Sequence, residues 1–477
     1  MKKNSDQQGK MTGVLKENMA YLNERLAVDV SFDLVYRVIR IGGKDACIYF
    51  IDGFCKDELM QKMLQYFMGI KEEEMPQDAH EMSKCCVPYV EVDLKDQWDE
   101  IIGNLLSGVL ILLIDGYMQA ILIDSRTYPA RNVTEPDKDK VLRGSKDGFV
   151  ETIVFNTALL RRRVRSADLR IEMMSAGENS RTDIAVCYMD SRVDQNFLKQ
   201  IKDRIRDIKV DALTMNQESL AECLYQRRWY NPFPKFKYTE RPDTAAAQIY
   251  EGNIVVLVDN SPSAMIMPTS IFDVIEEADD YYFPPITGTY LRLSRFLIAI
   301  LTFIMTPTFL LLMTHQSYIP EAFSFIVLKE TENIPLIWQF LILELAIDGL
   351  RLAAVNTPNM LSTPLSVMAA LVLGEFSVNS GWFNAEVMLY MAFVAIANYT
   401  QANYELGYAL KFMRILTLLL TNWFGLWGYI GGIVICPAAI VTNRTVSEKS
   451  YIYPLLPFHF RQLCKRLFRL RLPDARK

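Results

Sequence analysis

The spacing of hydrophobic positions along this chain changes once, close to residue 290. Upstream of that point, short apolar segments alternate with charged ones, whereas downstream long apolar runs follow one another with few Lys or Arg before Lys411. An apolar run of about 18 residues can cross most of the ~30 Å hydrocarbon core of a bilayer. The pattern therefore predicts an α/β soluble region followed by an α-helical, polytopic membrane domain.

The predicted membrane domain contains several apolar runs, the first of which includes Pro307, a predicted kink. The runs are Phe296–Met313, Pro335–Ala354, Pro364–Ser380, Phe383–Asn398 and Phe412–Val441. Arg292 and Arg295 precede the first run and the tail after Phe460 is basic, so the positive-inside rule places both flanks in the cytoplasm. Two cytoplasmic flanks require an even number of crossings. Either the glycine-rich last run folds into two crossings, or one run is re-entrant; the short segment from Ile319 is a further re-entrant candidate.

The soluble region shows two pairs of similar segments. GVLILLIDGYMQAILI from Gly108 and GNIVVLVDNSPSAMIM from Gly252 lie 144 residues apart, and each has the pattern of a hairpin whose turn contains an aspartate. CIYFID and AVCYMD lie 138 residues apart, and each precedes an amphipathic helical pattern. The two matches in the same order predict two related α/β subdomains. The hairpin aspartates, Asp115 and Asp259, are expected to form turns, with ligand binding between the subdomains as the alternative.

An arginine-rich segment, FNTALLRRRVRSADLR, lies between the two predicted subdomains. Phe149, Ile153, Leu160 and Val164 recur at helical spacing, which predicts a helix over 149–165 with arginines in its last turn, where cations offset the helix dipole. Three roles for the arginines stay open: the charged end of a connecting helix, a joint to carboxylates of a neighbouring subunit, or binding of anionic lipid headgroups. The net charge of −5 and the lack of a wider basic surface argue against nucleic-acid binding.

The start of the chain, its cysteines and histidines, and its short motifs give no indication of a cofactor or of catalysis. The start of the chain, MKKNSDQQGKMTGV, lacks the apolar stretch of a signal peptide, so we expect a cytoplasmic soluble region. We expect the eight cysteines of the chain to be reduced thiols. The three histidines lie far apart, so no metal or other cofactor is expected. No Walker loop, Gly-x-Gly-x-x-Gly after a strand or Gly-x-Ser-x-Gly occurs, and we expect no enzymatic activity.

Three ionisable residues lie within the second apolar run. Glu344, Asp348 and Arg351 are four and three residues apart, so a helix places them on one face. Ionisable groups at membrane depth usually face protein or a water-filled cavity. They are therefore candidates for lining a pore; the alternatives are pairing that stabilises helix packing, in which Asp348 bonds Arg351, and a catalytic acid–base pair.

Two long segments resemble a known family. SRTYPARNVTEPDKDKVLRGSKDGFVETIVFNTALLRRRVRSADLR is similar to the signature of the GerA family of spore germination receptor A subunits, and NPFPKFKYTERPDTAAAQIYEGNIVVLVDNSPSAMIMP matches a second block of that family. Where receptor subunits tend to carry Asp-Gly-Thr-Pro and Glu-x-x-Arg-Glu-Ala, this chain has DNSPS and ELAIDGLRLAAVNTP, which more closely resembles the stage V sporulation protein AF branch.

The polar residues that match the family motifs, together with the clustered arginines, are candidates for contacts between subdomains or subunits. They are Arg131, Glu135, Arg143, Asp147, Glu151, Asn156, Arg161, Arg162, Arg163, Arg165, Glu240, Arg241 and Asp243. The expected parts of the chain are an α/β subdomain over 1–147, a connecting helix over 148–170, a second α/β subdomain over 171–290, the membrane domain over 291–445 and a basic tail over 446–477.

The resemblance also implies a function. It implies a homo-oligomeric ion channel, expected to be a pentamer, in the inner membrane of the spore, with its multi-pass domain in membrane lipid and its N-terminal region in the cytoplasm. Other germination proteins of that membrane are expected partners. The alternatives are a non-conducting scaffold or receptor partner and, third, an intramembrane enzyme.

Overall fold

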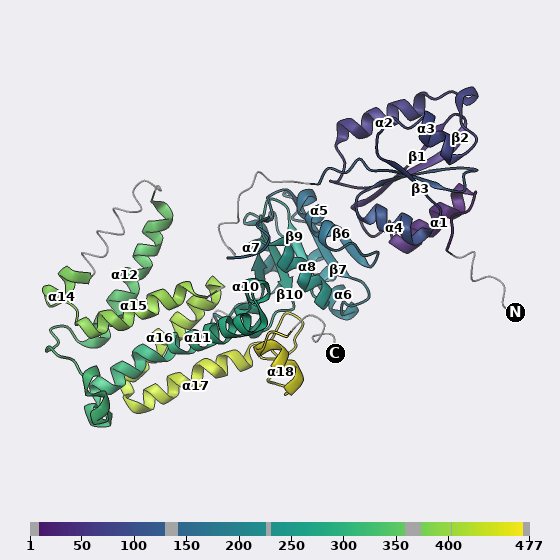
Figure 1. The fold of residues 1–477 in the computed structure, drawn as a ribbon. Helices are drawn as coiled ribbons and strands as arrows, with labels where there is room; N and C mark the ends of the chain where they lie inside the picture. The colour runs from purple at the N-terminus through teal and green to yellow at the C-terminus, as the bar shows by residue number, and fades with distance from the viewer. Residues whose placement is uncertain (1–8, 129–141, 226–229, 358–373, 402, 471–477) are drawn as a thin grey trace. The chain divides into compact units, whose positions relative to one another are not determined.

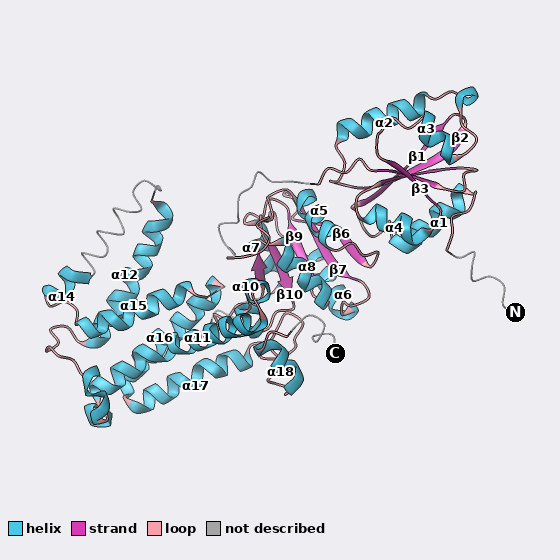
Figure 2. Cartoon of the chain, in the orientation of Figure 1, coloured by secondary structure: helices cyan, strands magenta, loops and turns pink. Residues whose placement is uncertain are grey.

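A computed structural model of the chain describes residues 9–128, 142–225, 230–357, 374–401 and 403–470. The chain forms two compact units, which we call the sheet unit and the helical unit. The sheet unit comprises Met1–Gln226 with Tyr238–Pro268, and the helical unit comprises Arg227–Lys237 with Thr269–Lys477. Figure 2 shows two groups of strands in the first part of the chain, followed by a part built from helices.

The sheet unit begins with a five-stranded sheet whose strand order is β1-β2-β4-β5-β3. The strands are β1 Leu34–Ile41, β2 Lys44–Ile51, β3 Val92–Lys95, β4 Leu110–Ile114 and β5 Ala120–Ile123. Four helices accompany them: α1 Leu15–Leu26, α2 Asp57–Gly69, α3 Ala79–Cys85 and α4 Trp98–Leu106. All pairings in this sheet are antiparallel.

Helices cover both faces of this sheet, with α1 and α4 on one side and α2 and α3 on the other (Figure 1). Successive side chains of a strand point to opposite faces. In β4, Ile111 and Leu113 therefore lie in the core beneath α1 and α4, while Leu110 and Leu112 lie in the core beneath α2 and α3. A sheet covered on both sides explains why this strand is apolar throughout and does not alternate.

A second five-stranded sheet repeats this plan with the order β6-β7-β9-β10-β8. Its strands are β6 Leu169–Ala176, β7 Thr182–Met189, β8 Lys237–Thr239, β9 Ile254–Val258 and β10 Ala264–Met267, and its helices are α5 Ile153–Arg163, α6 Gln195–Arg206, α7 Asn216–Leu224 and α8 Pro242–Glu251. The register repeats as well, because Leu110 pairs with Ile123 in the first hairpin and Ile254 with Met267 in the second. The prediction of two related subdomains is confirmed.

The hairpin aspartates have the same structural role in both subdomains. Asp115 Oδ1 accepts a hydrogen bond from the backbone nitrogen of Leu15, the first residue of α1, at 2.9 Å. Asp259 Oδ1 accepts from the nitrogen of Ile153, the first residue of α5, at 3.2 Å. A carboxylate at this place satisfies one of the free N–H groups of a helix start and complements the helix dipole.

The helix α5 is shorter than the predicted range of 149–165, because the preceding residues make other bonds. Asn156 donates from Nδ2 to the carbonyl oxygen of Val150, and its Oδ1 accepts from the Val150 nitrogen at 2.8 Å. These bonds occupy the backbone that a longer helix would use. Phe149, Leu160 and Val164 nevertheless lie in the core of the second subdomain, as their spacing predicts.

The helical unit is built around one long helix, α11 (Pro285–Thr314). Its helices are α9 Ile271–Ile275, α10 Asp279–Tyr282, α11 Pro285–Thr314, α12 Leu336–Asn356, α14 Ser377–Asn379, α15 Ala385–Tyr399, α16 Tyr404–Phe424, α17 Leu426–Thr442 and α18 Phe460–Leu467. Of the described helices, α11 alone is both long and apolar enough to cross a membrane, while α15 and α17 are apolar but shorter. The number of crossings therefore stays a prediction, and most of the predicted run Pro364–Ser380 lies outside the described residues.

The last predicted run, Phe412–Val441, belongs to two helices. Gly425 separates α16 from α17 with φ 57° and ψ −130°, a conformation that residues with a Cβ rarely adopt. The two helices pack closely at Gly432, where a Cβ would lie only 2.5 Å from Thr417 Cγ2. The segment from Ile319, the other re-entrant candidate, contains the short 3₁₀ helix η3 Glu321–Ile326.

Candidate functional site

One arginine of the predicted cluster joins the two subdomains within the chain. Arg161, at the end of α5, is fully buried and paired with Asp33, which precedes β1 and is also buried. Arg161 Nε donates to Asp33 Oδ2 at 2.7 Å and Nη2 donates to Oδ1 at 3.1 Å, which is the bidentate geometry that arginine favours with carboxylates. Beside this pair, the Phe32 nitrogen donates to the carbonyl oxygen of Ile171 in β6 at 3.1 Å.

Other signature residues hold the segment before α5 in place. Arg163 forms an ion pair with Asp147, and both side chains are partly exposed. The carbonyl oxygen of Glu151 accepts from the nitrogen of Asn260, in the turn between β9 and β10, at 2.8 Å. Asn156 adds its two bonds to the same segment. The segment is thereby fixed to α5 and to the hairpin of the second subdomain.

The second family block contacts the same segment from the start of α8. Arg241 is buried, pairs with Asp243 at 2.6 Å, and donates from Nη2 to the carbonyl oxygen of Ser145 at 2.8 Å. The carbonyl oxygen of Glu240 accepts from the Phe149 nitrogen at 2.8 Å. The two sequence blocks that carry the family resemblance therefore meet in the folded chain.

The remaining arginines of the cluster lie nearer the surface. The Arg162 guanidinium lies 4.6 Å from the ring centre of Tyr128, and Arg165 Nη2 lies 3.5 Å from the Tyr128 hydroxyl. Arg143 is exposed. Two further candidates, Arg131 and Glu135, lie outside the described residues.

Two of the three predicted membrane residues, Glu344 and Asp348, lie in an ionic cluster shared by α11, α12 and α16. Glu344 of α12 and Arg414 of α16 are both buried, and Arg414 Nε donates to Glu344 Oε1 at 2.8 Å. Lys411, one turn before Arg414, lies 3.4 Å from Glu344 Oε2 and also pairs with Asp348. Arg414 Nη1 donates to the carbonyl oxygen of Thr302 in α11 at 3.1 Å. Two acids and two bases thus form a neutral group among three helices.

Arg351, the third predicted residue, lies outside this cluster, among aromatic rings. Its guanidinium carbon lies 4.9 Å from the ring centre of Tyr399, 5.7 Å from that of Tyr404 and 5.5 Å from that of Tyr408. Cation–π contacts of this kind stabilise a partly desolvated cation. Among the described residues Asp348 pairs with Lys411, so the pairing of Asp348 with Arg351 that was one alternative is not the arrangement in the structure.

The two basic partners, Lys411 and Arg414, were not singled out as site residues from the sequence. They lie three residues apart at the start of the long last run, and Glu344 and Asp348 lie four apart, so each pair falls on one face of its helix. What the sequence lacked was the pairing of α12 with α16, which brings residues 63 and 70 positions apart together.

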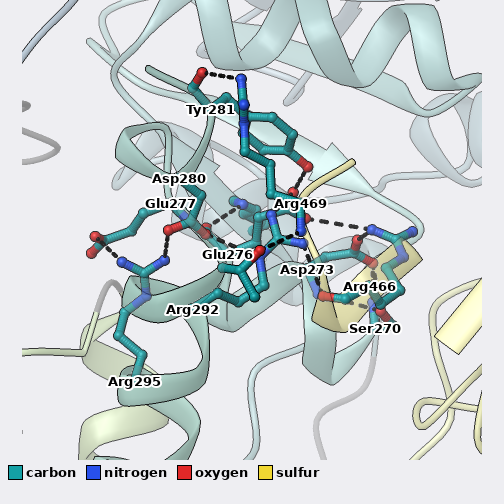
Figure 3. Close-up of polar contacts among 12 residues, drawn as sticks. Ser270, Asp273, Glu276, Glu277, Asp280, Tyr281, Arg292, Arg295, Arg466 and Arg469 are labelled. Atoms are coloured by element: carbon teal, nitrogen blue, oxygen red, sulfur yellow. Dashed lines mark hydrogen bonds and ion pairs between the residues drawn. The ribbon is translucent and has the colours of Figure 1, made fainter. Parts of the chain in front are cut away.

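A second ionic cluster lies where α11 begins, and we call it the collar. Four carboxylates of α9, α10 and the residues between them contact arginines of α11 and of the C-terminal segment (Figure 3). The collar carboxylates are Asp273, Glu276, Glu277 and Asp280, and the collar arginines are Arg292, Arg295, Arg466 and Arg469. Asp280 is fully buried between Arg292, at 3.2 Å, and Arg295. These two arginines, which were expected to mark the cytoplasmic flank, are thus buried and neutralised.

No group of three or more His, Cys, Asp or Glu side chains suited to a metal ion occurs within the part of the chain that the structure describes. All eight cysteines are free. Burial raises the pKa of the Cys47 thiol to about 12, and burial likewise raises the pKa of Cys187, so these two thiols are held protonated in their cores.

Comparison with known proteins shows that nearly the whole chain is similar to spore germination and sporulation proteins. The family model of the Bacillus/Clostridium GerA spore germination protein matches residues 20–477. Stage V sporulation protein AF of Bacillus subtilis is 34% identical over 461 residues, which are 96% of this chain and 93% of that protein. Spore germination protein KA of the same organism is 25% identical and covers 93% of this chain and 82% of its own length. The similarity to the stage V branch is as the motifs predict.

One solved structure is also similar. The N-terminal domain of the A subunit of the Bacillus megaterium spore germinant receptor GerK3 is 28% identical, covers 54% of this chain and 96% of its own length, and aligns with a TM-score of 0.43.

Proposed function

Because the chain belongs to the GerA family of spore germination proteins, we propose that it acts in the germination of bacterial spores as a subunit of an ion channel. The channel is a homo-oligomer, a pentamer, in the spore inner membrane, with the sheet unit on the cytoplasmic side. The names of its relatives, which are sporulation and spore germination proteins, support the role in germination.

The observation that carries the channel proposal is the ionic cluster of α11, α12 and α16. Charged side chains at membrane depth are costly unless they face protein or water. Glu344 and Arg414 face protein, but the Asp348 side chain is 31% exposed in the single chain. Asp348 therefore forms the open end of the cluster, where water or a neighbouring subunit can contact it. A carboxylate repeated around an oligomer forms a ring that favours cations.

An apolar stripe on α12 supports an oligomer in lipid. Exposed apolar side chains recur along the helix at intervals of three, four or seven residues: Trp338, Ile342, Leu345, Leu352 and Val355. A soluble protein rarely exposes a continuous apolar stripe, whereas a membrane protein covers one with lipid or with a second subunit.

The alternative is a non-conducting scaffold or receptor partner of other germination proteins. The observation that favours it is the neutrality of the cluster, since Glu344, Asp348, Lys411 and Arg414 satisfy one another within one chain. A cluster of this kind can serve to pack helices alone. The scaffold would assemble correctly and bind other germination proteins without conducting ions.

Ion flux through the purified full-length protein in liposomes tests the proposal. Asp348→Asn is a better perturbation than a change at Glu344, whose loss would leave the buried Arg414 without a carboxylate partner. A unit charge ~10 Å from the ions contributes ~1.7 kcal/mol at an effective dielectric constant of ~20. We therefore expect Asp348→Asn to lower the cation-to-anion permeability ratio about tenfold.

Two variants control this experiment. The double variant Asp348→Asn/Lys411→Gln restores local neutrality and should return the ratio toward that of the original protein. Glu375→Gln makes the same kind of change at an exposed residue outside the cluster and should leave the ratio unchanged. Flux with unaltered selectivity would remove Asp348 from the path. No flux from a correctly assembled oligomer would favour the scaffold.

A further inference from the structure

The end of the described chain combines exposed apolar and basic side chains. From Tyr453 to Leu470 the sequence contains four Lys or Arg residues and no Asp or Glu. Large apolar side chains in this segment are exposed, among them Leu456 at 52%, Phe458 at 62% and Phe460 at 70%. Such a segment offers both an apolar surface and a positive charge to a partner.

Helix α18 arranges these residues by helical spacing. Phe460, Leu463 and Leu467 lie three and four residues apart on one face, and none of the helix's residues is buried. Arg461 and Lys465 lie four residues apart on an adjacent face. Arg461 has no ion-pair partner among the residues that the structure describes. An amphipathic helix with basic residues beside its apolar face is the type that lies on membrane surfaces.

The collar fixes α18 to the start of α11. Arg466 forms an ion pair with Asp273, and its carbonyl oxygen accepts from Arg292 Nη1 at 2.9 Å. Just beyond the helix, the Arg469 nitrogen donates to Thr289 Oγ1 at 3.1 Å. Figure 3 shows the Arg466 side chain directed at Asp273, while Arg469 Nη2 donates to the carbonyl oxygen of Tyr281 in α10 at 2.7 Å. The orientation of α18 relative to α11 is thereby determined.

These contacts place α18 near a defined depth. The apolar part of α11 begins at Phe296, four residues after Arg292 and seven after Thr289. At a rise of ~1.5 Å per residue the contacts lie roughly 6 to 10 Å outside the start of the apolar run. The headgroup region on each side of a bilayer occupies about that distance, and interfacial helices bury their apolar face ~5–10 Å into the headgroup boundary.

We propose that α18 and the turn before it, Leu455–Leu467, bind the surface of an anionic membrane, with Phe458 and Phe460 among the acyl chains and Arg461 and Lys465 at the lipid phosphates. The inference rests on the membrane location in the proposed function. The occupant is lipid because the segment contains basic residues and no acidic residue, and because it adjoins the first residues of a spanning helix. The collar then links the lipid surface to α9 and α10, which precede α11.

Hydrogen exchange of the full-length protein in nanodiscs tests this binding. Discs of phosphatidylcholine alone are compared with discs that also contain phosphatidylglycerol, and exchange is followed in peptides covering 455–467. Each basic residue near an anionic surface contributes about fivefold to binding. We expect exchange about 25-fold slower in the anionic discs, and most of this difference should disappear in Arg461→Gln/Lys465→Gln and in high salt.

A matched control removes two exposed lysines from the sheet unit. Lys62→Gln/Lys199→Gln should retain the full lipid-dependent protection. Equal exchange in both kinds of disc would overturn the proposal, as would protection that depends on a second copy in the disc. Failure of the protein to enter discs would refute the membrane location and this inference with it. Correct insertion with an unprotected α18 would overturn the lipid contact alone.

Discussion

Replacing Arg161 by alanine tests whether the buried pair with Asp33 holds the two subdomains together. Both side chains are buried, at 0% and 2% exposure, so the variant leaves the Asp33 carboxylate without its partner and without water. Removing one partner of a buried pair costs about 3–5 kcal/mol. We expect the opening free energy of the adjacent amides in β6 to fall by that amount.

Native-state hydrogen exchange on the full-length protein measures this opening free energy at individual amides. The matched control is Arg40→Ala, which removes the arginine of an exposed pair with Asp45 whose side chains are 73% and 57% exposed. Exposed pairs contribute about 0–1 kcal/mol. The double variant Arg161→Met/Asp33→Leu removes both charges and should recover most of the loss. An effect of Arg161→Ala no larger than that of Arg40→Ala would refute the reasoning.

Two further predictions concern packing and thiol chemistry. Gly428→Ala would place a Cβ 3.0 Å from the Thr421 nitrogen and closer still to the Leu420 carbonyl. Thermal unfolding in detergent should therefore show that the variant is less stable by about 1–3 kcal/mol. The control is Gly431→Ala, whose Cβ would meet nothing within 4 Å and which should unfold like the original protein. Burial raises the pKa of the Cys47 thiol to about 12, so iodoacetamide at pH 8 should alkylate the exposed Cys85 and leave Cys47 unmodified until the protein unfolds. Equal rates of alkylation at both thiols would contradict the burial of Cys47.

The same shift in Cys47 has a consequence for stability at alkaline pH. An ordinary thiol loses its proton above a pKa of about 8.5, which is the value expected in the unfolded chain. The folded state retains the proton up to its pKa of about 12, so it binds more protons than the unfolded state between these values. The contribution of Cys47 to the free energy of unfolding is therefore fully present below pH 8 and declines as the pH rises from about 8.5 to about 12.

The repeated architecture could be predicted from the sequence because it depends on local spacing. The hairpins from Gly108 and Gly252 each contain two apolar strands and a turn within sixteen residues, so the local pattern was enough to predict them. The bonds of Asp115 and Asp259 could not be predicted in the same way, since their partners lie 100 and 106 residues away. Turn formation was a correct but incomplete expectation for these aspartates.

The burial of charged side chains was harder to predict, because the residues that neutralise them are brought close only by the tertiary fold. Hydropathy placed the first membrane run at Phe296, whereas the helix α11 begins at Pro285 and includes Arg292 and Arg295, which the collar carboxylates neutralise. In the arginine cluster, composition could not distinguish the buried Arg161 from its exposed neighbours. The partner that buries it, Asp33, lies 128 residues away.

The aspartate caps affect the order in which the chain can fold during synthesis. The start of α1 is complete only when Asp115 has been made, and β5, which ends at Ile123, follows within a few residues. The first subdomain can therefore close while the ribosome is still translating α5, whereas the bond between Arg161 and Asp33 must form later. A chain that ends between Ile123 and Arg161 and has been released from the ribosome should thus carry one closed subdomain whose Asp33 has no arginine partner.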